Sequence, residues 1–162
     1  MNYYDEIAQG YEELHKEEQE KKIEIVKKHL RLKPNYKLLD VGCGTGLTTM
    51  PWNCKRYGID PSAKLLERAK GKDEIEYKLA FAEKIPYPDK YFDVVISITA
   101  IQNFNDISKG LSEIKRVCSG IVVLSFLKKS AKKEMIISEI YKLFKIDEVV
   151  EEEKDLIFFG KV

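Results

Sequence analysis

The sequence LLDVGCGTG at residues 38–46 decides the fold, because an apolar run leads directly into an acidic residue and three glycines at alternating positions. Glycine lacks a Cβ atom and adopts positive φ without strain, so Gly42, Gly44 and Gly46 allow a ligand to lie against main-chain N–H groups. The dinucleotide fingerprint G-x-G-x-x-G spaces its glycines differently. This spacing argues against NAD binding, so we keep a nicotinamide-dependent oxidoreductase only as a less favoured alternative function.

Outward from this turn, the hydrophobic pattern alternates between helix and strand, with no internal repeat or low-complexity segment. Helices are predicted over residues 11–32 and from Ser62, Asp106 and Ser130, with a first crossover helix reduced to about two turns around residues 47–50. The predicted strands cover residues 37–43, 57–60, 74–79, 92–98, 121–127, 146–152 and 155–161.

The last two strands are too close together for a crossover helix, so they form an antiparallel hairpin. The pattern predicts an α/β fold: a Rossmann-like seven-stranded sheet, mostly parallel with an antiparallel C-terminal hairpin, and helices on both faces. The length of 162 residues predicts a single domain, with a helical segment at residues 1–34 and the α/β core at residues 35–162.

Composition and charge narrow the classes of partner. The net charge of +1 does not indicate a nucleic-acid or membrane surface. The N-terminus is too polar for a signal peptide and no apolar run is long enough to span a membrane, so we expect a cytoplasmic protein. Cys43, Cys54 and Cys118 form no C-x-x-C pair, which favours reduced thiols over a disulfide framework or a metal site.

The segment DVGCGTG at residues 40–46 resembles motif I of the class I S-adenosylmethionine-dependent methyltransferases, D/E-x-G-x-G-x-G. YGIDPS at residues 57–62 is similar to motif II of that family, and the resemblance covers essentially the whole chain. It implies S-adenosyl-L-methionine as the cofactor and an in-line displacement at its sulfonium methyl group. The residues of this turn that it implies for cofactor binding are Asp40, Gly42, Cys43, Gly44 and Gly46, with the glycines at the amino-acid end.

Asp60, followed by Pro61, ends the second predicted strand and is expected to accept hydrogen bonds from both ribose hydroxyls. The alternative is that Asp60 only caps the next helix.

The segment AFAEKIPYPDKYFD at residues 80–93 looks like the family's G-D-A-E-x-L-P-F-P-D-x-x-F-D. Phe81 stands where the family has an aspartate that accepts from the adenine amino group; phenylalanine cannot accept, but it can pack on the ring. We expect Phe81 and Ala82 to flank the adenine, Glu83 to belong to the same cofactor site, and the selectivity for the cofactor to be weaker or altered. The alternative places Phe81 in the core.

After the fourth predicted strand, SITAIQNF at residues 97–104 occupies the position of an L-H-H-type turn in similar enzymes. Gln102, together with Tyr11, is expected to border the methyl pocket, and Thr99 is expected to bind the cofactor. An amide orients groups but does not act as a general base at neutral pH, so no catalytic residue is assigned. The alternative is a loop that only precedes the helix at Asp106.

Three further features have two interpretations each. The N-terminal YYDEIAQGYEEL at residues 3–14 resembles the lid segment of these enzymes, which implies that Tyr4 and Tyr11 cover the cofactor unless they merely pack. Trp52 either fills the core or covers the edge of the cofactor. The lysines at positions 128, 129, 132 and 133 either attract an anion or form a solvated helix start.

The sequence does not specify the methyl acceptor. With no inserted cap or recognition domain, a small-molecule acceptor would lie in an open site, whereas a macromolecule or a partner could complete it. Small archaeal relatives that the chain resembles include enzymes that rely on a small zinc-finger activator to modify tRNA or translation factors, which implies a small activator subunit as partner. The alternative function is a non-catalytic S-adenosylmethionine-binding or scaffold protein.

Overall fold

The computed structural model describes residues 3–69, 71 and 74–162, with side chains from Glu12 onward. The chain divides into two compact units, residues 1–31 and residues 32–162. The first unit contains one helix, α1 (Tyr3–His29). It begins earlier than the residue 11 at which the periodic helix was predicted to start, and it lies within the helical segment predicted at residues 1–34. Ile23 and Val26 are buried, as the predicted apolar stripe requires.

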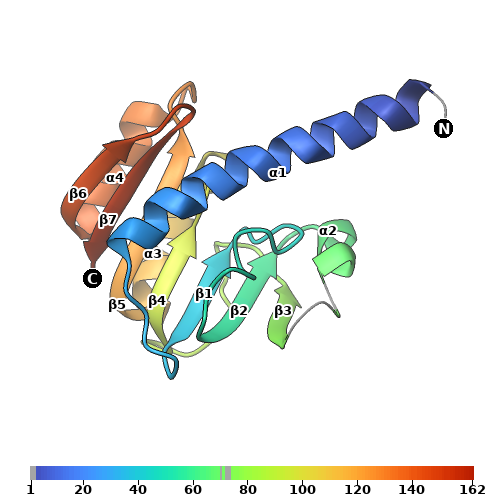
Figure 1. The fold of residues 1–162 in the computed structure, drawn as a ribbon. Coiled ribbons are helices and arrows are strands. Elements are labelled where there is room, and N and C mark those ends of the chain that lie inside the picture. Colours follow the sequence, from blue (N-terminus) through green and yellow to red (C-terminus); the bar gives the residue numbers. More distant parts are fainter. Residues whose placement is uncertain (1–2, 70, 72–73) are drawn as a thin grey trace. The chain divides into compact units, whose positions relative to one another are not determined.

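The second unit is built on one seven-stranded sheet of order β3-β2-β1-β4-β5-β7-β6 (Figure 1). The first five strands are parallel, and β7 runs antiparallel to both of its neighbours, β5 and β6. The strands are β1 (Lys37–Val41), β2 (Lys55–Asp60), β3 (Ile75–Leu79), β4 (Phe92–Ser97), β5 (Cys118–Leu127), β6 (Lys145–Glu151) and β7 (Asp155–Lys161).

Three α-helices and a 3₁₀ turn connect these strands: α2 (Ala63–Ala69), η1 (Ile101–Asn103), α3 (Ile107–Val117) and α4 (Lys133–Leu143). The connection β2-α2-β3 and the connection β4-α3-β5 advance in opposite directions along the sheet, so right-handed crossovers place α2 and α3 on opposite faces. The predicted fold class is confirmed, including the antiparallel C-terminal hairpin.

Polar side chains set the starts of the helices. Asp106 caps α3 by accepting from the main-chain nitrogen of Lys109 at 3.0 Å, and Ser62 accepts from that of Leu65 at 3.2 Å before α2. The α4 helix begins at Lys133 rather than at Ser130, because the Ser130 hydroxyl accepts from the nitrogen of Lys132 within a preceding turn.

The predicted crossover helix around residues 47–50 is wrong: hydrogen-bonded turns cover residues 44–51. Pro51 lacks the N–H that a continuing helix needs, and the hydroxyls of Thr48 and Thr49 both bond to Asp40. Trp52 is buried, and its indole nitrogen donates to the carbonyl of Thr48 at 2.8 Å. The prediction that Trp52 fills the core is confirmed.

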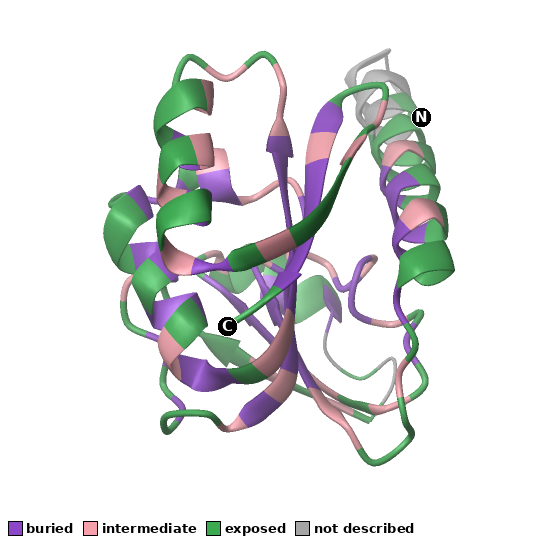
Figure 2. Ribbon diagram, turned by 90° about the vertical axis from the view of Figure 1, so that its left-hand side faces the viewer, coloured by how far each residue is buried: buried purple, intermediate pink, exposed green. Residues whose placement is uncertain are grey.

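The core follows the central strands, as Figure 2 shows in purple. Most of β4 and the middle of β5 are buried, whereas the edge strand β6 is mostly exposed and only Ile146 and Val150 are partly buried. A strand buried on both faces reads as an unbroken apolar run, which is why β4 and β5 were the clearest strands in the sequence.

Candidate functional site

The strand order reverses beside β1, since β2 lies on one side of it and β4 on the other. Ligands of open α/β sheets bind outside the carboxyl ends of the strands at such a point. Four segments lie at these carboxyl ends. They are residues 40–46 at the end of β1, residues 60–61 at the end of β2, residues 80–83 after β3 and residues 97–102 at the end of β4. Apart from Tyr4 and Tyr11, every residue predicted for cofactor binding belongs to one of these segments.

The glycine loop, residues 42–46, has the backbone that its sequence predicts. Gly42, Gly44 and Gly46 have φ values of +82°, +55° and +88°. A Cβ atom at Gly42 would lie 2.6 Å from the Cβ of Ala100, so the loop passes directly against the segment that follows β4. The main-chain nitrogens of Gly42 and Cys43 both donate to the carbonyl of Ile59, which joins the loop to β2.

Asp40 lies beneath the glycine loop and is completely buried. Its Oδ2 accepts from the hydroxyls of Thr48 at 2.6 Å and Thr49 at 2.7 Å, while Oδ1 has no hydrogen-bond partner among the described residues. Burial raises the pKa of Asp40 to about 6, against the lowering effect of the two hydroxyls. Burial likewise raises the pKa of the Cys43 thiol well above its ordinary range. Both side chains therefore support the loop from inside.

Asp60 joins three segments at the end of β2. Its Oδ2 accepts from the main-chain nitrogen of Gly44 at 2.9 Å, and its Oδ1 accepts from that of Ser62, also at 2.9 Å. The bond to Ser62 agrees with the capping alternative, and the bond to Gly44 adds a link that capping does not need. A carboxylate has about four lone-pair sites, so both oxygens can still accept from a diol.

Phe81 is 53% exposed and so is not part of the core, which was the alternative interpretation. Its segment is held next to Asp60, because the main-chain nitrogen of Ala80 donates to the carbonyl of Asp60. Leu65 and Leu79 are exposed as well, while Ala82 is buried. One carboxylate oxygen of Glu83 is buried without a hydrogen-bond partner in the described part of the chain. The exposed ring of Phe81 can pack on a base, and the neighbouring carboxylate of Asp60 can accept from a ribose, so the two together suit a nucleoside.

The turn after β4 has an unusual backbone at Thr99, whose φ is +57°. The side-chain amide of Gln102 donates to the carbonyl of Thr99 at 2.9 Å, and its oxygen is buried with no hydrogen-bond partner among the residues described. The Thr99 hydroxyl donates to Asp155 at 2.7 Å, and so does the hydroxyl of Ser125 at 2.8 Å. Neither Ser125 nor Asp155 was predicted from the sequence, because no local pattern connects them to Thr99.

The side chain of Tyr11 lies outside the described residues, as does that of Tyr4, so their predicted contact with the cofactor stays a prediction. Pro61 follows Asp60 and is exposed. Within the described part of the chain, no group of three or more His, Cys, Asp or Glu side chains could hold a metal ion. In that same part, no helix combines the length and the apolar character that a membrane crossing requires.

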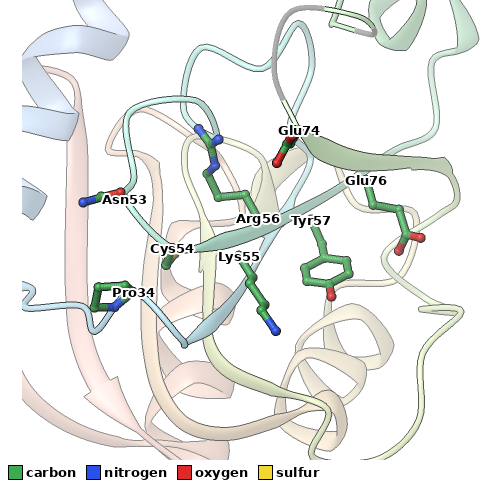
Figure 3. Close-up of a pocket in the computed structure, with 8 residues that line it drawn as sticks. All are labelled: Pro34, Asn53, Cys54, Lys55, Arg56, Tyr57, Glu74 and Glu76. Carbon is green, nitrogen blue, oxygen red and sulfur yellow. The ribbon is translucent and has the colours of Figure 1, made fainter.

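A separate pocket of about 400 Å³ lies at the amino ends of β2 and β3 (Figure 3). Two basic and two acidic side chains are among the residues that line it, which are Pro34, Asn53, Cys54, Lys55, Arg56, Tyr57, Glu74 and Glu76. Because parallel strands begin at this edge, the pocket is not the site at the switch point. The half-buried Cys54 belongs to its wall.

A family model described as a methyltransferase domain matches residues 39–124, which is more than half of the chain and includes the glycine loop, Asp60 and the Thr99 turn. The chain belongs to the class I S-adenosylmethionine-dependent methyltransferases. S-adenosyl-L-methionine is therefore its cofactor. The glycine loop, the remaining acceptor capacity of Asp60 and the exposed ring of Phe81 fit the amino-acid end, the ribose and the adenine of that molecule.

This methyltransferase is 30% identical to an uncharacterized protein of Methanocaldococcus jannaschii, over 98% of this chain and 82% of that protein. It spans less than half of the length of several other curated relatives. A methyltransferase structure from Aquifex aeolicus superposes with a TM-score of 0.73 at 21% identity, over 86% of this chain and 89% of that one. The Haloferax volcanii complex of the Trm112 methyltransferase activator with a methyltransferase gives a TM-score of 0.72 at 13% identity, over 90% and 92% of the two chains.

Proposed function

We propose that this methyltransferase transfers a methyl group from S-adenosylmethionine to an acceptor by in-line displacement at the sulfonium centre. The observation that carries the proposal is the junction of Asp60 with Gly44, which sits at the switch point beside the exposed Phe81. The cofactor supplies the activated methyl group. The chain supplies position, and a well-oriented pair of reactants needs little further assistance.

Each segment at the switch point is assigned one part of the cofactor to bind. Asp60 accepts from the ribose hydroxyls, and the glycine loop leaves main-chain N–H groups open to the amino-acid end. Phe81 and Ala82 flank the adenine, with Glu83 next to them. Gln102 borders the methyl group, Thr99 belongs to the same turn, and Tyr11 keeps the role at the methyl pocket that the resemblance implies.

We propose a macromolecular acceptor, a tRNA or a protein of translation, and a small activator subunit as partner. The four lysines at positions 128, 129, 132 and 133 follow β5 at the same edge as the cofactor site, where they can attract an anionic acceptor. Lys128 lies 3.4 Å from Glu151, so its charge is partly offset. The methyltransferase in the Haloferax volcanii structure is bound to an activator, which supports the same kind of partner here.

Calorimetric titration of S-adenosylhomocysteine and S-adenosylmethionine into the purified protein tests the cofactor site, with Asp60→Ala as the variant and Asp89→Ala as the control. Asp89 is a largely exposed acid paired with Arg116. Micromolar binding that Asp60→Ala abolishes and Asp89→Ala retains supports the proposal. Binding that survives Asp60→Ala unchanged contradicts the placement of the ribose.

Transfer of a labelled methyl group from S-adenosylmethionine to tRNA and to protein fractions of a cell extract then tests the acceptor, with and without an added activator subunit. Label in RNA or protein that depends on Asp60 supports methyl transfer to a macromolecule. Tight cofactor binding with no transfer under any of these conditions favours the alternative of a non-catalytic binding or scaffold protein.

A further inference from the structure

Thr99 has a left-handed backbone that its residue type disfavours. A β-branched residue at φ = +57° is a conformational outlier, and Lys90 is the other described non-glycine residue with positive φ. Such a conformation persists only where the surrounding structure determines it. The contacts that hold Thr99 therefore indicate what the fold is built to fix.

Two buried residues that are distant in sequence, one on β5 and one on β7, hold Thr99 in place. Its main-chain nitrogen lies 3.1 Å from the carbonyl oxygen of Ser125 and 2.9 Å from the hydroxyl oxygen of the same residue. Its hydroxyl and that of Ser125 both donate to one carboxylate oxygen, Oδ2 of Asp155, at 2.7 and 2.8 Å. Ser125 and Asp155 are both completely buried. Hydrogen bonds to an ionised acceptor are among the stronger ones in proteins.

Asp155 arrives at this position through the C-terminal hairpin. It is the first residue of β7, and the antiparallel register pairs it with Leu127 at the end of β5. This pairing brings the start of β7 to the carboxyl edge of the parallel strands, where the cofactor site lies.

The turn that Asp155 fixes forms one wall of that site. Ala100 lies close to Gly42: a Cβ atom added at Gly42 would be 2.6 Å from the Cβ of Ala100. The carbonyl of Thr99 accepts from the side chain of Gln102, which orients the amide. A change in the backbone at Thr99 would therefore move both the contact with the glycine loop and the amide of Gln102.

We propose that Asp155 is a positioning residue of the cofactor site: its carboxylate holds Thr99 in the left-handed conformation and so fixes residues 99–102 against the glycine loop. This inference rests on the proposed function for the identity of the ligand. It makes the C-terminal hairpin part of the site, although β7 contributes no atom to the predicted contacts with the cofactor.

Titration of S-adenosylhomocysteine into Asp155→Ala, Thr99→Val and the double variant tests the proposal. The matched control is Phe158→Leu, which disturbs the packing on Phe126 from the opposite face of β7. We expect Asp155→Ala to weaken binding by about tenfold, the effect of losing a charged hydrogen-bond partner. Thr99→Val is expected to have a similar effect, and the double variant to be little weaker than either single one.

The control separates positioning from stability. Phe158→Leu lowers the stability to urea but leaves the affinity unchanged, whereas Thr99→Ser, which keeps the hydroxyl, recovers the affinity that Thr99→Val loses. If Asp155→Ala does not fold, the nearly isosteric Thr99→Val carries the test alone. The proposal is overturned if folded Asp155→Ala or folded Thr99→Val binds S-adenosylhomocysteine as tightly as the natural protein does. It is also overturned if the losses in affinity of the two single variants add fully in the double variant.

Nuclear magnetic resonance gives a second readout that needs no cofactor. The amide resonances of Gly42 and Ala100 are expected to shift in Asp155→Ala and in Thr99→Val but not in Phe158→Leu. If the natural protein binds no S-adenosylhomocysteine, the proposed function fails while these shifts still support the positioning role. Unshifted resonances overturn the positioning role whatever the cofactor does.

Discussion

The Oδ2 atom of Asp60 lies 2.9 Å from the main-chain nitrogen of Gly44, and this hydrogen bond ties the end of β2 to the glycine loop after β1. The other carboxylate oxygen of Asp60 accepts from Ser62 at the entry to α2. One side chain thus sets the distance between the loop and the helix that follow two neighbouring strands. A ligand that bonds to Asp60 meets a group already held in place.

Replacing Asp60 by asparagine should affect both stability and binding. An amide carries one oxygen, so its NH₂ group must face the N–H of either Gly44 or Ser62 and leave that donor unpaired. We expect a loss of about 1–3 kcal/mol in the free energy of unfolding and at least about tenfold weaker binding of S-adenosylhomocysteine. Urea titration and calorimetry measure the two effects. The exposed Asp89→Asn is the control, and an equal loss there would argue against a specific role for Asp60.

Gly42 of the glycine loop can be compared with Gly71, which lies outside the loop and has nearly the same φ. Gly71→Ala, at φ = +83°, would bring the added Cβ within 4 Å of no described atom beyond its chain neighbours, so it should cost only the conformational strain of about 1–2 kcal/mol. Gly42→Ala, at φ = +82°, adds the clash with Ala100 and should cost about 1–3 kcal/mol more. Urea unfolding of both variants measures the difference. Adding Ala100→Gly to Gly42→Ala should remove the second part of the cost, and no recovery would contradict the contact.

Asp40 should give the protein a distinctive dependence of stability on pH. Burial raises its pKa from 3.8 to about 6, so the folded state binds this proton more tightly than the unfolded state does. Stability contributed by the protonated form is therefore present below pH about 4 and is lost as the pH rises to about 6, with a total of about 3 kcal/mol. Asp40→Asn removes this titration.

The measurement for Asp40 is the difference in unfolding free energy between the natural protein and Asp40→Asn at several pH values. Other groups also change the stability with pH, such as Glu113, whose pKa is lowered by its hydrogen bond to Arg116 and whose contribution is lost at more acidic pH, but their effects cancel in the difference. The natural protein is expected to lose stability relative to Asp40→Asn between pH about 4 and 6. A difference that does not change with pH would contradict burial as the dominant effect.

Phe81 should leave the adenine amino group poorly recognised. A phenyl ring stacks on a purine whether its 6-substituent is an amino or an oxo group, so the natural protein is expected to bind S-adenosylhomocysteine and its deaminated inosine analogue with similar affinity. Phe81→Asp introduces an acceptor and should favour the adenine form by about tenfold. Competition calorimetry measures the ratio.

The matched variant for this prediction is Phe81→Leu, which keeps an apolar side chain at an exposed position and should not discriminate between the two compounds. Because Phe81 is 53% exposed, all three proteins should have similar stability. Strong discrimination by the natural protein would point instead to Glu83, whose carboxylate has a buried oxygen without a partner among the described residues.

The elements that the sequence predicted well are those with a strong local signal. The strands β4 and β5 are mostly apolar, and the positive φ values of the glycine loop follow from the glycines themselves. Asp106 was recognised as a cap because it directly precedes an amphipathic helix. In each case a few neighbouring residues contain the whole physical reason.

The features that the sequence did not predict depend on contacts between distant residues. Around residues 47–50, helical bonding competes with two threonine hydroxyls that bond to the buried Asp40, and the tertiary contact prevails. Thr99 and Asp155 are 56 positions apart, and neither has a neighbour that indicates the other. A left-handed threonine is also unexpected from its own conformational preference, so this part of the site required the structure.

The position of β7 has a consequence for the synthesis of the protein. In chain order β7 follows β6, yet it lies between β5 and β6 in the sheet. While the ribosome has produced the chain only as far as β6, β5 keeps an open edge and β6 has no strand to pair with in its native place. The nascent chain also lacks Asp155, so Thr99 and the wall of the cofactor site cannot yet be fixed. Productive encounter with the cofactor then follows translation of β7, and an arrested chain that ends before it exposes a strand edge to aggregation.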